Sequence, residues 1–289
     1  MEAPHPNRTV LESPPNMAAL FARAALTARG RGGNLPDTRL ARTSVTVDPD
    51  DLAAYDRVCG FTFGDSLPPT YPHMITFPLQ LALMTDRSFP LALPGFVHLR
   101  NRIDVIRPIR ADEALDVEVW AERFATHRSG AAVDLRATVT IGGEEVWRST
   151  STYLARGAQA PEGAPEAVTD VAVTDLERTA ATWRIPDDAG RRYATVSGDV
   201  NPIHLSGLTA KAFGFKRAIA HGMWVKARVL GALAGRLPDA LELDVSFRKP
   251  LFLPSTVTLS TAEAAGGWEF AVRNAQSGTE HVVGTIRPL

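Results

Sequence analysis

The feature that most constrains the fold is an apolar helical segment followed by short segments with period-two alternation. Residues 223–237, MWVKARVLGALAGRL, are apolar on nearly every side apart from three basic residues. A helix of this kind is largely buried. In 241–248, leucine, valine and phenylalanine alternate with polar residues, which is typical of an antiparallel strand with one dry face. Further strands are predicted at 256–260, 268–274 and 281–286.

The first half of the chain repeats this arrangement. Residues 47–61 resemble 185–199 at an offset of 138, which places tyrosine on tyrosine and glycine on glycine. Further on, His73 falls opposite His221, with about ten extra residues in the second half. The sequence therefore predicts one structural unit used twice.

The strands expected after the first helix complete the first unit. They are 115–121, 132–141 and 144–154, and the stretch 103–109 resembles 245–251 at an offset of 142. One buried helix followed by a run of antiparallel strands is an α+β layer, with a sheet curled around its helix.

Two segments lie outside the repeats. Residues 1–40 form an N-terminal extension with a Pro-rich start and one helix, roughly 17–29, expected to be a packing arm or a partly disordered leader. Residues 156–170 are rich in Ala, Pro, Gly and Glu without a hydrophobic period, as in a surface linker. The repeats are then 41–155 and 171–289.

Composition excludes several classes of protein. The 289 residues include 31 basic and 32 acidic side chains, so nothing indicates a nucleic-acid partner. The one cysteine, Cys59, excludes an intramolecular disulfide and a cysteine-rich metal site. The apolar stretch 17–26 contains Arg23 and is too short to span a bilayer, and the start lacks the apolar core of a signal peptide. We expect a cytoplasmic protein without a membrane span.

The candidate site begins at 197–204, SGDVNPIH, where Asp199 and His204 are five residues apart. On a continuous helix they would point about 140° apart. Pro202 disfavours helical geometry at Asn201, so a turn there can direct both side chains toward one water or substrate carbon. The alternative is an ordinary Asx-type turn with an incidental surface histidine.

The second part of the site is AHGM at 220–223, which opens the buried helix. The first N–H groups of a helix lack intrahelical acceptors, and glycine lets a ligand approach them closely. Together with the helix dipole, the N–H of Gly222 would stabilise a developing oxyanion. The alternative is that Gly222 is small only because a sheet packs against it.

The stretch 193–223 resembles the signature of the MaoC-like dehydratases, the (R)-specific enoyl-thioester hydratases of the hot-dog fold. The repeat, the length and LPPTYPHM at 67–74 are similar to the double hot-dog members found in actinobacteria. The resemblance implies two long buried helices wrapped by an antiparallel sheet, with the acyl chain of a thioester in a tunnel at the helix.

The resemblance also implies the roles of residues. Asp199 and His204 would be the catalytic pair, and the N–H of Gly222 would hold the thioester carbonyl. Supporting roles would fall to Ser197, Asn201 and His221, although His221 is equally well explained as a structural histidine. Neither a metal nor another cofactor is expected.

The first repeat departs from this pattern, since the positions of the catalytic pair hold Phe61 and Ser66. Asp65 and His73 lie nearby in sequence, but the Asp-x4-His spacing is absent. We therefore expect the first repeat to be non-catalytic and to shape the tunnel. The aromatic residues that could line the tunnel, or belong to the core, are Phe61, Phe63 and Phe77.

The predicted activity is reversible hydration of a trans-2-enoyl thioester to an (R)-3-hydroxyacyl thioester in fatty-acid metabolism. The substrate would be carried by coenzyme A or acyl carrier protein, and the protein would be a monomer or a homodimer. The alternatives are a hot-dog acyl-thioesterase and a non-catalytic subunit that binds acyl thioesters.

Overall fold

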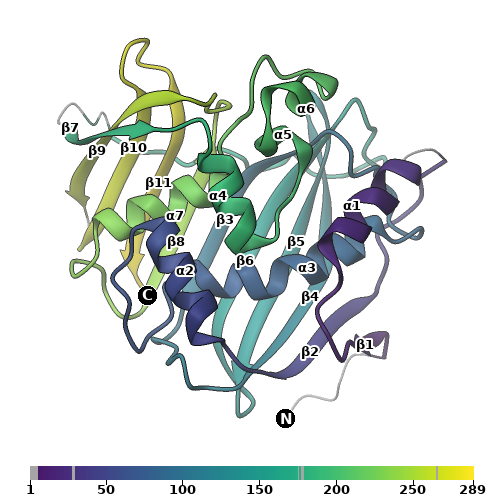
Figure 1. The fold of residues 1–289 in the computed structure, drawn as a ribbon. Coiled ribbons are helices and arrows are strands. Elements are labelled where there is room, and N and C mark those ends of the chain that lie inside the picture. The colour runs from purple at the N-terminus through teal and green to yellow at the C-terminus, as the bar shows by residue number, and fades with distance from the viewer. Residues whose placement is uncertain (1–5, 28–29, 175, 177–178, 265) are drawn as a thin grey trace.

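In the computed structural model, one curved sheet carries the fold (Figure 1). The structure describes residues 6–27, 30–174, 176, 179–264 and 266–289. The strands of the first half are β1 (Arg8–Val10), β2 (Arg39–Val45), β3 (Phe96–Val105), β4 (Leu115–His127), β5 (Gly130–Ile141) and β6 (Glu144–Arg156). Those of the second half are β7 (Thr179–Ile185), β8 (Leu241–Phe247), β9 (Ser255–Ala264), β10 (Gly267–Asn274) and β11 (Glu280–Pro288).

The helices lie on one face of this sheet, as Figure 1 shows for α3 and α7. They are α1 (Met17–Leu26), α2 (Pro49–Cys59), α3 (Tyr71–Thr85), α4 (Ala189–Ser197), α5 (Pro202–Leu205), α6 (Gly207–Ala212) and α7 (Gly222–Ala232). None of the described helices is long and apolar enough to cross a membrane.

The strand order confirms the internal repeat. It runs β1-β2-β4-β5-β6-β3-β8-β11-β10-β9-β7. Read inward from each edge after β1, the first half runs β2-β4-β5-β6-β3 and the second β7-β9-β10-β11-β8, which is the same order of equivalent strands. The halves meet where β3 pairs antiparallel with β8, and there Arg102 lies opposite Asp244. These two residues are 142 positions apart, which is the offset found in the sequence. A local two-fold axis therefore passes through this pair.

The helices that precede the two buried ones are also equivalent. Gly60 caps the end of helix α2 and Gly198 the end of helix α4, both with left-handed backbone at φ +78° and +69°. Such a conformation favours glycine at the helix end. Tyr55 and Tyr193 occupy equivalent positions in the two repeats, and their rings lie next to each other with centroids 6.4 Å apart.

The buried helix of the second half is shorter than predicted. Helix α7 ends at Ala232, because glycines at 231 and 235 weaken the helical continuation and Gly235 takes a left-handed conformation with φ +77°. Its Lys226 is fully buried, and the ammonium donates to the carbonyl and side-chain oxygens of Asn101 on β3 at 3.0 and 2.5 Å. A lysine that the sequence marks as an exception on an apolar helix therefore ties α7 to the centre of the sheet.

The described part of the N-terminal extension packs on the first half. Strand β1 pairs parallel with β2, and helix α1 contacts α3. The helix predicted at 17–29 is confirmed for Met17–Leu26, and residues 28 and 29 lie outside the described residues. The segment after β6 crosses the outer side of the central strands, where the hydroxyl of Ser246 on β8 donates to the carbonyl of Thr169 at 2.8 Å.

Candidate active site

The chain turns at Asn201, as the sequence predicts. The side chain of Asn201 accepts a hydrogen bond from the N–H of Ile203 at 3.4 Å and so caps α5, of which Pro202 is the first residue. Proline fits this position because its missing N–H would have no intrahelical partner. Asp199 precedes the turn and His204 lies within α5, so the two side chains are brought to one side of it.

The backbone of the turn holds the Asp199 carboxylate. The N–H of Asn201 donates to Oδ1 of Asp199 at 3.2 Å, and the N–H of Asp199 donates to the hydroxyl of Ser197 at 3.1 Å. The Asp199 side chain is 20% exposed. Burial raises the pKa of its carboxyl above the usual 3.8, and the charge of His204 and the Asn201 N–H partly oppose this.

A backbone carbonyl sets the tautomer of His204. Its Nδ1–H donates to the carbonyl of Ile219 at 2.8 Å, which leaves the lone pair on Nε2. Burial lowers the pKa of the imidazole below its usual value, although Asp199 opposes this. A methyl group at Gly190 on α4 would lie 2.1 Å from the carbonyl oxygen of His204, so glycine is required for α4 and α5 to pack this closely.

His221 contacts both residues of this pair. Its ring stacks on that of His204 with centroids 3.6 Å apart, and its Nε2–H donates to the backbone carbonyl of Asp199 at 3.1 Å. Burial lowers the pKa of His221 well below its usual value. The sequence left open whether His221 orients the loop or is structural, and this bond shows that it contacts the turn at Asp199 directly.

One nitrogen or oxygen from each of Asp199, His204 and His221 lies within 4.8 Å of the others. This is the spacing of a possible metal site. Each imidazole uses one nitrogen on a backbone carbonyl, which leaves Nε2 of His204 available as a proton acceptor. An imidazole nitrogen and a carboxylate at this spacing also suit proton transfer to and from one substrate.

Gly222 is the first residue of α7, so its N–H lies in the turn whose donors lack intrahelical partners. A methyl group at this position would lie 2.7 Å from the ring of Phe247 on β8. Phe247 therefore packs directly against this glycine, which supports the packing explanation. It is compatible with an oxyanion role, because the same lack of a side chain leaves the N–H accessible.

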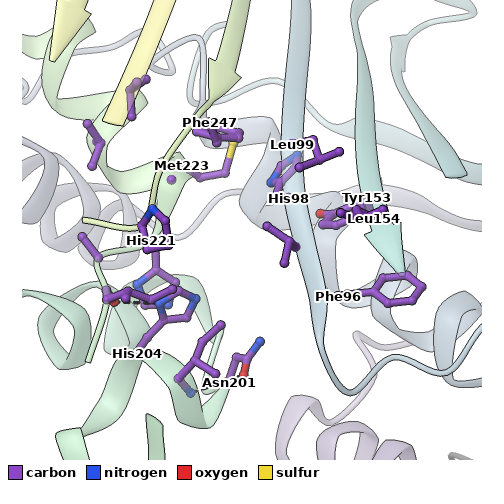
Figure 2. A pocket seen from close by; sticks show the side chains of 18 of the residues that line it. Phe96, His98, Leu99, Tyr153, Leu154, Asn201, His204, His221, Met223 and Phe247 are labelled. Carbon is purple, nitrogen blue, oxygen red and sulfur yellow. Dashed lines mark hydrogen bonds between the residues drawn. The ribbon is translucent and has the colours of Figure 1, made fainter. Parts of the chain in front are cut away.

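The candidate residues share one cavity of about 1010 Å³. Asp199, His204 and Gly222 line it on one side. Figure 2 shows His98 on β3 and Tyr153 on β6 on the opposite wall. The cavity is therefore built by both halves of the chain.

The opposite wall was not found from the sequence. The rings of His98 and Tyr153 stack with centroids 4.3 Å apart. Burial raises the pKa of Tyr153 above its usual value, and the charge of Asp199 adds to this. Both residues come from strands of the other repeat, forty or more positions before the signature, so no local motif marks them. Only their pairing through β3 and β8 brings them to the site.

The polar residues expected in the first repeat lie in different places. His73 on α3 is buried and lines the cavity, and burial lowers its pKa to about 3. Asp65 forms an ion pair with Arg110 at 3.2 Å in which both side chains are exposed. Of the three aromatic candidates, Phe77 lines the cavity, Phe61 packs against the core and Phe63 is exposed.

Comparison with known proteins places the chain in a family. The family described as MaoC like domain matches residues 157–284. The 3-hydroxyacyl-thioester dehydratase X of Mycobacterium tuberculosis is 39% identical over 268 residues, which cover 93% of this chain and 95% of that protein. The (R)-specific enoyl-CoA hydratase of Aeromonas caviae is 36% identical over 70 residues, or 23% of this chain and 52% of its own.

The structural comparison agrees. The crystal structure of HtdX from Mycobacterium tuberculosis matches with a TM-score of 0.77 and 38% identity, and covers 87% of this chain and 100% of that chain. The two equivalent half-sheets and buried helices confirm the double hot-dog fold expected from the sequence. The chain belongs to the MaoC-like dehydratase family of hydro-lyases.

Proposed function

We propose that the protein is an (R)-specific 3-hydroxyacyl-thioester dehydratase of fatty-acid metabolism, which in reverse hydrates trans-2-enoyl thioesters. The observation that carries the proposal is the convergence of Asp199 and His204 in one cavity with Gly222, the first residue of α7. The names of the relatives from Mycobacterium tuberculosis and Aeromonas caviae support the same reaction and the same stereochemistry.

The proposed mechanism uses these three groups in the hydration direction. A water held between the Asp199 carboxylate and Nε2 of His204 gives a proton to the pair as its oxygen bonds to C3. The electrons of the double bond move toward the thioester oxygen, where the N–H of Gly222 stabilises the negative charge. The proton then returns from the pair to C2 on the same face, so water adds syn and both groups regain their starting state.

Ser197, Asn201 and His221 are proposed to hold the pair in position. Each makes a hydrogen bond with the backbone or carboxylate of Asp199. Neutral His204 is suited to accept a proton, because burial lowers its pKa and its other nitrogen is held by Ile219.

The proposed units are the N-terminal extension (1–40), a non-catalytic first repeat (41–155), a linker (156–170) and a catalytic second repeat (171–289). The first repeat would provide the acyl tunnel. On α3, the residues His73, Phe77, Leu81 and Met84 all line the cavity, which at these spacings makes them one face of the helix. The face spans about 16 Å at 1.5 Å per residue, enough for an extended alkyl chain of roughly 12 to 14 carbons.

The carrier is proposed to bind at the basic rim of the cavity. Arg128, Arg156 and Lys249 line the cavity with exposed side chains, and within the described part of the chain they form no ion pair. Three free cations attract the phosphates of coenzyme A or of the phosphopantetheine arm of acyl carrier protein. Replacing Lys249 by Gln should raise KM for a CoA ester and leave kcat nearly unchanged.

A thioesterase would use the same fold and the same substrate class, but its water would attack the carbonyl carbon. The test is incubation of the pure protein with crotonyl-CoA, with enoyl absorbance and free thiol measured together. Loss of absorbance without thiol, and an (R)-3-hydroxybutyryl product on chiral analysis, supports the proposal. Release of thiol supports hydrolysis, and no turnover of any enoyl thioester supports a non-catalytic binding subunit.

Two further predictions belong to this proposal. From the sequence features alone, we propose that the protein is cytoplasmic. A monomer is possible because two hot-dog units in one chain provide the two-fold pair, and a homodimer of chains is the alternative. Light scattering of the purified protein distinguishes these two states.

A further inference from the structure

Helix α1 lies along the cavity between the catalytic turn and the far end of α3. At its start, the Cγ atom of Met17 lies 3.3 Å from where a methyl group on Gly198 would be, one residue before Asp199. Near its end, Arg23 contacts Asp86, the residue after α3, at 3.5 Å. The helix therefore bridges two parts of the chain that the cavity separates.

Phe21, between these two contacts, lines the cavity. With Met17 and Leu20 it packs against an apolar cluster that contains Leu81 and Met84. These are the last two residues of the α3 face that we propose to follow the acyl chain. Phe96, on the wall across from His204 in Figure 2, belongs to the same cluster.

Arg31 fastens this part of the extension to α3. Its guanidinium donates to the carbonyls of Thr85 at 3.0 Å, Asp86 at 2.7 Å and Phe89 at 2.9 Å, at the helix end where carbonyls lack intrahelical partners. It also donates to the carbonyl of Thr27 at 2.8 Å, just after α1. These bonds join the residue after α1 to the end of α3, so α1 is held in place along the cavity.

From this arrangement we infer that α1 is the side wall of the acyl site and that Phe21 contacts the distal carbons of a long acyl chain. The inference rests on the proposed function for the identity of the ligand. It makes residue 21 a determinant of chain-length specificity, because a four-carbon acyl group held at Gly222 ends before it reaches the far end of α3.

The first experiment compares Phe21→Ala with the wild-type full-length protein on trans-2-enoyl-CoA esters of 4, 8 and 12 carbons. Removing the ring should raise KM for the 12-carbon ester about tenfold, since most of the apolar contact of one phenylalanine is lost. Values for the 4-carbon ester should change by less than about twofold. The matched control is Leu26→Ala, on the same helix but 86% exposed, which should leave the whole chain-length profile unchanged.

A uniform change across all chain lengths, or no change at 12 carbons, would overturn the inference. A second measurement does not depend on turnover. Amide hydrogen exchange in Met17–Leu26 is followed with dodecanoyl-CoA and with butyryl-CoA, neither of which has a double bond to hydrate. The inference predicts protection by dodecanoyl-CoA only. Equal protection by both, or by neither, contradicts it, whereas a wild-type protein that binds dodecanoyl-CoA at α1 but hydrates no enoyl ester contradicts the proposed function alone.

Discussion

Replacing Gly222 by Ala tests the start of α7 as the oxyanion site. The added methyl would lie 2.7 and 2.8 Å from two ring carbons of Phe247, whereas ordinary contact begins near 3.4 Å. The ring cannot simply swing away, since its other neighbours include His98 with ring centroids 4.9 Å apart. The first turn of the helix or the ring must therefore move by about 0.7 Å.

A displacement of this size predicts a specific kinetic result. Misplacement of a catalytic group by about 1 Å costs about 100-fold, so kcat for crotonyl-CoA should fall roughly 10- to 100-fold. Overpacking should also lower the free energy of unfolding by about 1–3 kcal/mol. Denaturant titration measures the second effect separately from the first. Adding Phe247→Leu to the variant should restore room and part of the lost kcat.

Gly231→Ala is the matched control on the same helix. A methyl group there would lie 2.7 Å from the carbonyl oxygen of Gly60, so the crowding is similar but lies away from the cavity lining. This variant should be destabilised comparably and keep kcat within about twofold for its folded fraction. If Gly222→Ala retains wild-type kcat, or Gly231→Ala loses as much, the oxyanion assignment is refuted.

Three further predictions concern charge and packing. Burial raises the pKa of Asp199 above 3.8 and lowers that of His204 below 6.5. In a pH–rate profile, kcat/KM should therefore rise between these two pH values and stay level to pH 8. A fall in kcat/KM between pH 7 and 8 would contradict this. Burial raises the pKa of Asp56 to about 6, so the stability that its protonated form contributes is lost as pH rises through 6. In urea titrations, Asp56→Asn should therefore raise the free energy of unfolding by about 1–2 kcal/mol at pH 7.5 and leave it unchanged near pH 4. Gly190→Ala should push α5 away and lower kcat at least tenfold, and an unchanged kcat would show that α4 does not position His204.

Local sequence was sufficient to predict the pair and its turn. Asp199 and His204 are five residues apart, and the proline between them restricts the backbone enough to determine where the helix breaks. The repeat could be predicted as well, since the offset of 142 is a property of the sequence and reappears as the pairing of Arg102 with Asp244.

The other parts of the site depend on contacts between residues that are far apart in the sequence. His98 and Tyr153 reach the site only through the pairing of β3 with β8. The role of Gly190 depends on how closely α4 packs on α5, and that of Arg31 on the end of a helix more than fifty residues away. A packing arm could be expected from composition, but its position along the cavity could not.

The central claim is that Asp199 and His204 act as one proton-transfer unit. The most direct test is kcat/KM for crotonyl-CoA with Asp199→Asn, His204→Gln and the double variant, each checked for folding. The account predicts a loss of roughly 100- to 10,000-fold for either single variant and little further loss in the double variant, because two members of one unit are not additive. Wild-type turnover in either single variant, or losses that multiply in the double variant, would contradict it.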